Sequence, residues 1–209
     1  MKLQEKLGLL LVAATALFAG QFYYQLHQQK QYSETTLVYQ QPRVVEPFKL
    51  YDQNEQLVDN ASIAGKWNLV FLGYLSCPDI CPMTMAKLSR LLPELNEISQ
   101  VPVQVLFVSV DPKRDTAEKR KQYVEYFNPD ILGLGAEHKD LFPFVRNLGL
   151  MYSIPDNDAI DYFVDHSASV VLINPDGKTA AIFKPEIKLG QVPTIDPEVI
   201  AEDFKTLLK

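Results

Sequence analysis

The feature that most constrains the fold is a pair of continuous apolar runs, residues 66–76 and 101–111. Unbroken apolar runs of this length are typical of central strands that are buried on both faces of a sheet. After the first run, apolar side chains recur at the three- and four-residue spacing of an amphipathic helix, at Met85, Leu88, Leu92, Leu95 and Ile98. A kink or an early break is expected at Pro93. Strands that alternate with helices predict an α/β sheet with helices on both faces.

The rest of the chain continues this alternation. The sequence predicts a short strand pair in residues 44–59, a helix at 116–127 with Thr116 as N-cap, a short strand at 131–137, a helix at 138–150 ending at Gly149, a hairpin at 167–183 and a final helix at 196–208. We find no internal repeat and no second domain in this pattern.

The N-terminal segment differs in composition from the rest. Residues 1–24 contain a long uncharged stretch behind the basic Lys6, which predicts an N-terminal transmembrane anchor with the rest of the chain in the periplasm or an equivalent non-cytoplasmic space. A cleaved signal peptide is the alternative. Residues 25–43 are rich in glutamine and lack an apolar period, so we expect a linker there. The folded domain is expected to span residues 44–209.

Charge and cysteine content narrow the class of protein. The 209 residues include 20 Lys and Arg against 26 Asp and Glu, and this formal net charge of −6 gives no general attraction for nucleic acid, which we exclude as a partner. Two cysteines cannot build a disulfide framework, and a domain of this size does not need one. The cysteine pair is therefore expected to have a chemical role.

The two cysteines lie in the segment CPDICP, where a predicted strand ends and a helix begins. Placing Pro82 at the first helical position makes Cys81 the N-cap and leaves Cys77 in the preceding loop. The positive end of the helix dipole favours a thiolate at this place. A thiolate serves both disulfide exchange and metal binding, so a structural crosslink, a redox pair and a metal site all remain open.

A metal site would need a third ligand, and the chain has three histidines. His27 lies in the expected linker and is expected to be solvated. His138 lies among charges at the start of a predicted helix, where a surface position is expected. His166 stands directly before the first strand of the predicted hairpin, and a lone histidine there is more often structural than a ligand.

Three separated motifs together carry a resemblance that changes this estimate. GYLSCPDICP, VSVDPKRDT and DYFVDHS followed by NPDG resemble, in this order, the Sco (SenC) family of membrane-anchored, copper-binding assembly factors for cytochrome c oxidase. The resemblance covers about residues 44–205. It implies a thioredoxin-like fold, a central mixed sheet flanked by helices. It also implies copper ligands at Cys77, Cys81 and His166, with a supporting role for Asp111.

The resemblance implies a copper metallochaperone that binds one copper ion and helps assemble the copper centre of cytochrome c oxidase. Its expected partners are the copper-bearing oxidase subunit and a copper donor protein. Two thiolates suit Cu(I), and an added imidazole gives a set that also holds Cu(II). The alternative is a thiol–disulfide oxidoreductase that uses Cys77 and Cys81 as a redox pair on the copper-site cysteines of an oxidase subunit.

Overall fold

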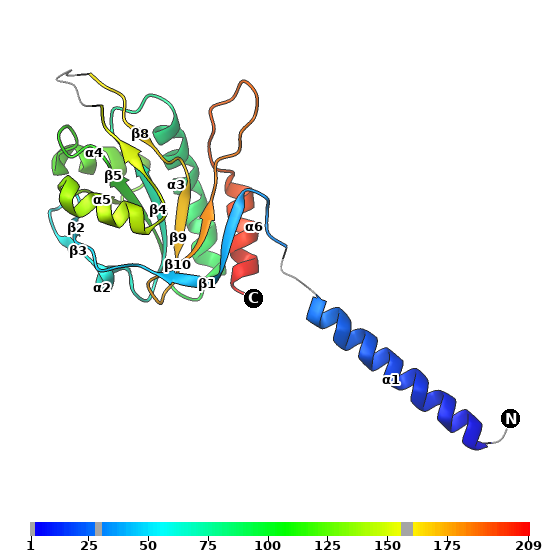
Figure 1. Cartoon of the computed structure of the whole chain (residues 1–209). Helices are drawn as coiled ribbons and strands as arrows, with labels where there is room; N and C mark the ends of the chain where they lie inside the picture. Colours follow the sequence, from blue (N-terminus) through cyan, green and yellow to red (C-terminus); the bar gives the residue numbers. More distant parts are fainter. Residues whose placement is uncertain (1–2, 28–30, 156–160) are drawn as a thin grey trace. The chain divides into compact units, whose positions relative to one another are not determined.

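The computed structural model describes residues 3–27, 31–155 and 161–209. It divides into two compact units, residues 1–31 and 32–209. In the first unit, helix α1 spans Leu3–His27 (Figure 1). His27 therefore lies at the end of a helix, although the sequence pattern places it in a linker.

The expectation of a transmembrane anchor within residues 1–24 is wrong. Within the described ranges, no helix is long and apolar enough to cross a membrane. Crossing the hydrocarbon core takes about 20 consecutive, predominantly apolar residues in a helix, and α1 does not meet this requirement. The expected localisation through a single N-terminal transmembrane helix is therefore not supported.

The second unit is built on a six-stranded mixed sheet in the order β1-β10-β9-β4-β5-β6 (Figure 1). The strands are β1 (Thr36–Val44), β4 (Trp67–Gly73), β5 (Val103–Ser109), β6 (Leu132–Leu134), β9 (Val170–Ile173) and β10 (Lys178–Phe183). Strands β4, β5 and β6 are parallel, whereas β9 and β10 form an antiparallel hairpin beside β4. The two long apolar runs are thus the central strands β4 and β5, as the pattern predicts.

Helices cover both faces of this sheet. The helices described in this unit are α2 (Asn60–Ile63), α3 (Ile80–Ile98), α4 (Ala117–Phe127), α5 (His138–Asn147) and α6 (Pro197–Leu207), of which α2 contacts β3. Helices α3 and α4 cross over between successive parallel strands, so the right-handed rule places them on one face, where α6 packs against α3. Helix α5 covers the opposite face (Figure 1). Helix α3 continues through Pro93, where a kink or a break was expected.

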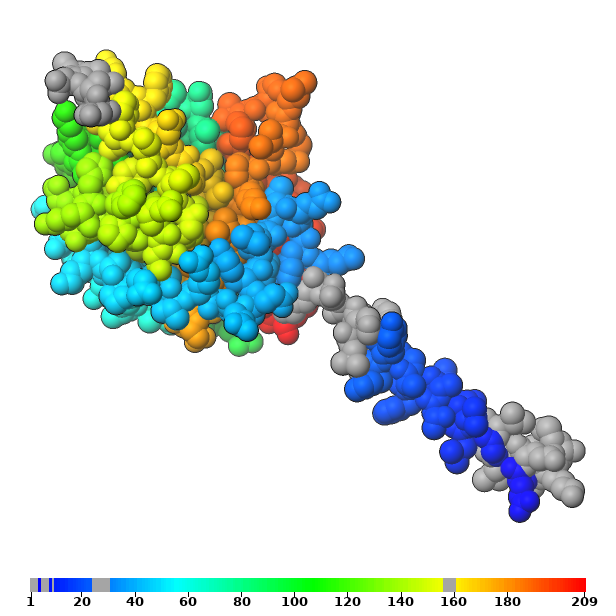
Figure 2. Space-filling model, viewed as in Figure 1, coloured from blue at the N-terminus to red at the C-terminus, as the bar shows by residue number. Residues whose placement is uncertain are grey.

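Strand β1 occupies residues 36–43 of the segment that was expected to be a linker. It pairs with β10 at the edge of the sheet, and most of its side chains are exposed (blue in Figure 2). Its register is irregular between Val38 and Arg43, around Pro42, which has no N–H to donate and is tolerated at an edge. An edge strand with exposed side chains needs no apolar period, so the sequence pattern could not reveal it.

Two short ribbons complete the unit. Strands β2 (Leu50–Tyr51) and β3 (Leu57–Val58) form the expected strand pair. Strands β7 (Tyr152–Ser153) and β8 (Asp165–His166) form a second ribbon outside the main sheet, which the sequence did not predict. This second ribbon positions His166.

Candidate metal centre

The helix after the cysteine loop begins two residues earlier than the sequence suggested. Helix α3 starts at Ile80 with Asp79 as its N-cap, so Cys81 lies in the first turn and is not the N-cap. Pro82 then occupies the third helical position, where its missing N–H is still one of those without a partner inside the helix. Cys77 remains in the loop before the helix, so both sulfurs lie near the positive end of α3.

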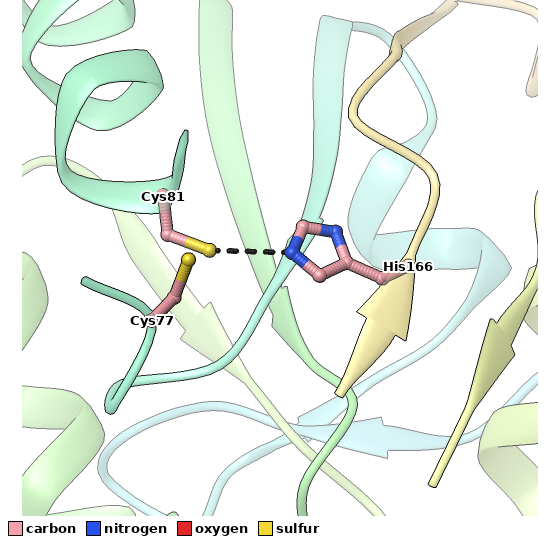
Figure 3. Close-up of side chains that lie close together, drawn as sticks. All are labelled: Cys77, Cys81 and His166. Carbon is pink, nitrogen blue, oxygen red and sulfur yellow. Dashed lines mark hydrogen bonds between the residues drawn. The ribbon is translucent and has the colours of Figure 1, made fainter. Parts of the chain in front are cut away.

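Cys77, Cys81 and His166 converge although 85 residues separate the second cysteine from the histidine (Figure 3). Cys81 Sγ lies 3.4 Å from His166 Nε2. One ligand atom from each of the three residues lies within 4.8 Å of the other two. Cys81 is fully buried, whereas Cys77 and His166 are half-buried, so the group is accessible from one side. The structure thus brings together all three expected ligands.

The hydrogen bonding of the imidazole leaves one nitrogen free to act as a ligand. His166 Nδ1 lies 3.2 Å from the carbonyl oxygen of Ser167, and a carbonyl can only accept, so Nδ1 carries the proton and donates. His166 Nε2 therefore presents its lone pair toward Cys81 Sγ. This is the arrangement found in histidine ligands, where a partner on the far nitrogen fixes the tautomer and the ring orientation.

Aromatic rings hold the imidazole in place from the side of the sheet. The ring centroid of His166 lies 6.2 Å from that of Phe71 and 5.9 Å from that of Tyr74, both in edge-on geometry. Next to Tyr152 and Ser167, His166 also lines a pocket of about 350 Å³. The imidazole thus has an aromatic wall beside it, and this pocket adjoins the β7–β8 ribbon without being lined by either cysteine.

The two thiols differ in acidity. The Cys81 thiol donates a hydrogen bond to the sulfur of Cys77, and this lowers the pKa of Cys77 against the opposing effect of burial. The same hydrogen bond and burial raise the pKa of Cys81. The lowered pKa favours the thiolate at Cys77, and a metal ion that binds both sulfurs must displace the proton of Cys81.

We predict that Cys77 in the reduced, metal-free chain reacts with iodoacetamide at pH 6 far faster than an ordinary thiol. A lowered pKa keeps the thiolate populated as the pH falls below the usual range, and the thiolate is the nucleophile. The rate is followed by mass spectrometry between pH 5 and 9. Replacing Cys81 by alanine removes the hydrogen-bond donor and should restore the dependence of an ordinary thiol. If the rate in the unaltered chain rose about tenfold per pH unit up to pH 8, the lowered pKa of Cys77 would be contradicted.

Asp111 is buried after β5, but its carboxylate is engaged by side chains other than the three expected ligands. The Tyr162 hydroxyl donates to Asp111 Oδ1 at 2.7 Å, and Arg114 Nε forms an ion pair with Oδ2. Arg114 in turn lies between the rings of Tyr74 and Tyr162. Any support that Asp111 gives to His166 is therefore indirect, through the arginine and the aromatic rings.

His138 is engaged elsewhere. Its Nδ1 lies 2.9 Å from the hydroxyl of Tyr152, and the two rings are stacked. The cluster of converging ligand atoms in the described part of the chain contains Cys77, Cys81 and His166 without it.

Two residues that sequence reasoning did not single out shape the site. Asp115 is buried, which raises its pKa, and its Oδ2 accepts from Ser109 Oγ at 2.6 Å and from the backbone N–H of Leu75 at 3.1 Å, so it fixes the loop that leads to Cys77. Gly73 ends β4 where a Cβ would lie only 2.9 Å from Cys81 Sγ. The sequence does offer a signal for Gly73, because it is a glycine at the end of a predicted buried strand, directly before the cysteine loop.

Comparison with known proteins agrees with this geometry. A family model described as SCO1/SenC matches residues 38–203. Protein sco1 of Schizosaccharomyces pombe is 31% identical over 184 residues, which cover 84% of this chain and 69% of that protein. The human mitochondrial SCO1 homolog is 32% identical over 148 residues, 70% of this chain but only 49% of the human protein. The chain thus spans about half the length of several mitochondrial relatives.

Solved structures give the same result. The crystal structure of Arabidopsis thaliana ScoI with copper bound matches with a TM-score of 0.67 and 28% identity, over 79% of this chain and 98% of that one. This match supports the thioredoxin-like α/β fold. Because the family model covers most of the chain and the fission-yeast relative exceeds 30% identity over more than two thirds of its length, this chain belongs to the SCO1/SenC family.

Proposed function

We propose that this chain binds one copper ion through Cys77, Cys81 and His166 and transfers it to the copper-bearing subunit of cytochrome c oxidase. The single observation that supports this most is the 3.4 Å approach of His166 Nε2 to Cys81 Sγ, with the far nitrogen of the ring already bonded to a carbonyl. Copper-bound relatives of the same fold support the choice of metal. The copper would come from a donor protein.

The donor set fits copper better than the closed sites typical of zinc. Structural zinc usually takes four protein ligands. His138 is the candidate for a fourth ligand, and its Nδ1 is hydrogen-bonded to the hydroxyl of Tyr152. Two sulfurs suit Cu(I), and two sulfurs with an imidazole also hold Cu(II). A three-ligand site that is half-open suits transfer of the ion. Asp111 supports the site from the neighbouring loop.

A thiol–disulfide oxidoreductase is the second candidate, and one observation favours it. A half-buried Cys77 with a lowered pKa beside a buried Cys81 with a raised pKa is the arrangement of an attacking and a resolving thiol. In this function the chain would reduce the copper-site cysteines of an oxidase subunit. Turnover on a disulfide substrate that survives His166→Ala but is lost in Cys77→Ser would favour it over copper transfer.

The proposed copper function is tested by metal stoichiometry. The full chain is reduced, loaded with copper, freed of excess metal and analysed for bound copper. We expect about one ion per chain, and a clear fall below this for His166→Ala, because loss of the nitrogen leaves only the two sulfurs.

His138→Ala is the matched control, since it removes a histidine that bonds Tyr152 and should leave the stoichiometry unchanged. If His166→Ala retained the full complement of copper, the three-ligand site would be wrong. Transfer is then measured by mixing the loaded chain with the isolated copper domain of the oxidase subunit and following copper in each.

A further inference from the structure

The segment that carries His166 has little secondary structure of its own to hold it. Strand β8 contains only Asp165 and His166, and among the described residues it pairs with β7 alone, outside the six-stranded sheet. Two-residue ribbons are marginal by themselves, because isolated strand pairs lack the packing that stabilises a sheet. Other contacts must therefore fix the imidazole against the thiols.

Besides the direct ring contacts of Phe71 and Tyr74, Arg114 contributes by lying between two tyrosines. Its Cζ is 3.6 Å from the ring centroid of Tyr162 and 5.7 Å from that of Tyr74. Tyr162 lies four residues before His166, whereas Tyr74 lies three residues before Cys77. The guanidinium thus connects the segment that carries the imidazole with the loop that carries the first sulfur.

A buried carboxylate holds the guanidinium in this place. Asp111 is fully buried, forms an ion pair with Arg114 Nε, and accepts a hydrogen bond from the Tyr162 hydroxyl at 2.7 Å. Arg114 Nη2 is buried without a hydrogen-bond partner among the described residues. Leaving that donor unpaired costs free energy, so the position of the side chain is determined by the ring contacts and the ion pair.

We propose that Arg114 is a positioning residue for the third metal ligand: it clamps Tyr162 against Tyr74 and so holds His166 beside Cys77 and Cys81. This inference rests on the proposed copper function for its affinity readout. The planar guanidinium is essential to the clamp, because it can stack on a ring face and pair with a carboxylate at once, whereas a lysine ammonium keeps the charge but loses the plane.

The first test needs no copper. In the metal-free Arg114→Met chain, amide hydrogen exchange in residues 161–167 should accelerate about tenfold, the size expected from losing a desolvated cation–π contact. The exchange rate of Arg114→Lys should lie between those of Arg114→Met and the unaltered chain. Arg90→Met is the matched control, since Arg90 is exposed and its Nε donates to the carbonyl of Ala86 in its own helix. Unchanged exchange in Arg114→Met would overturn the proposal.

The second test measures Cu(II) affinity in a double-mutant cycle. Arg114→Met should weaken binding toward the level of His166→Ala, and the double variant should be no weaker than His166→Ala alone, because both changes remove the same ligand. Additive losses would overturn the clamp. If Arg114→Met fails to fold, Tyr162→Leu is used instead in both tests. This variant removes the ring and the hydroxyl at a half-buried position.

The outcomes separate this proposal from the copper function. An unaltered chain that binds no copper would refute the proposed function, whereas the exchange experiment would still test the clamp. A chain that binds copper normally, with Arg114→Met indistinguishable in both tests, would refute the clamp alone.

Discussion

Replacing Cys77 and Cys81 together by serine is expected to abolish copper binding in a chain that still folds. A serine hydroxyl is a hard, protonated donor and cannot replace a thiolate for Cu(I). We expect the affinity to fall by more than about 100-fold, beyond the loss that follows a change in an outer-shell partner. Both cysteines are free thiols in the structure, so no crosslink is lost. The measurement is competition with a chromophoric Cu(I) chelator.

The control for this experiment is Ser76→Ala, an exposed change in the same loop that should leave the Cu(I) affinity intact. The unfolding of both variants in urea is measured as well, to check that each of them folds. A double-serine chain that keeps its copper would disprove the site. If the pair served only as a structural disulfide, its removal would cost about 2–4 kcal/mol of unfolding free energy, less for so short a loop.

Replacing Gly73 by alanine is expected to damage both the fold and the site. The added Cβ would lie 2.6 Å from Phe107 Cε2 and 2.9 Å from Cys81 Sγ, both too close for atoms in contact. Phe107 cannot easily move, since it is fully buried and packs against Tyr123 with ring centroids 5.2 Å apart. Overpacking of this kind typically costs about 1–3 kcal/mol of unfolding free energy. Cys81 should shift, and copper affinity should fall with it.

A double variant separates the steric cause from other effects. Replacing Phe107 by leucine in the Gly73→Ala chain makes room for the methyl group and should restore part of the lost stability. Gly20→Ala is the control, because a Cβ there meets no atom within 4 Å. Urea unfolding of the four chains gives the free energies. Full stability of Gly73→Ala, with normal copper affinity, would show that the strand end tolerates a side chain.

The central architecture could be predicted from the sequence because it follows from local patterns. The apolar runs of β4 and β5 and the helical spacing in α3 are each visible within a window of about 18 residues. Strand β1 was not predicted, because an exposed edge strand has no such pattern. The N-terminal segment was misjudged for the opposite reason, since an apolar composition suggested a membrane span that no described helix provides.

The sequence could name the three residues that converge, but not the contacts that surround them. Local pattern alone left His166 as a structural histidine, and only the combination of three motifs connected it to the cysteines. The contacts that place it involve Tyr162, Arg114 and Asp111, which meet only when separate loops fold together. Neither the β7–β8 ribbon nor this clamp has a periodicity that a sequence displays.

X-ray absorption spectroscopy of the copper-loaded chain identifies the atoms bound to the metal and so tests the three-ligand site directly. We predict two sulfur atoms and one imidazole nitrogen in the first shell of copper, with the imidazole signal absent in His166→Ala and retained in His138→Ala. A first shell without sulfur, or an imidazole signal that persists in His166→Ala, would contradict it.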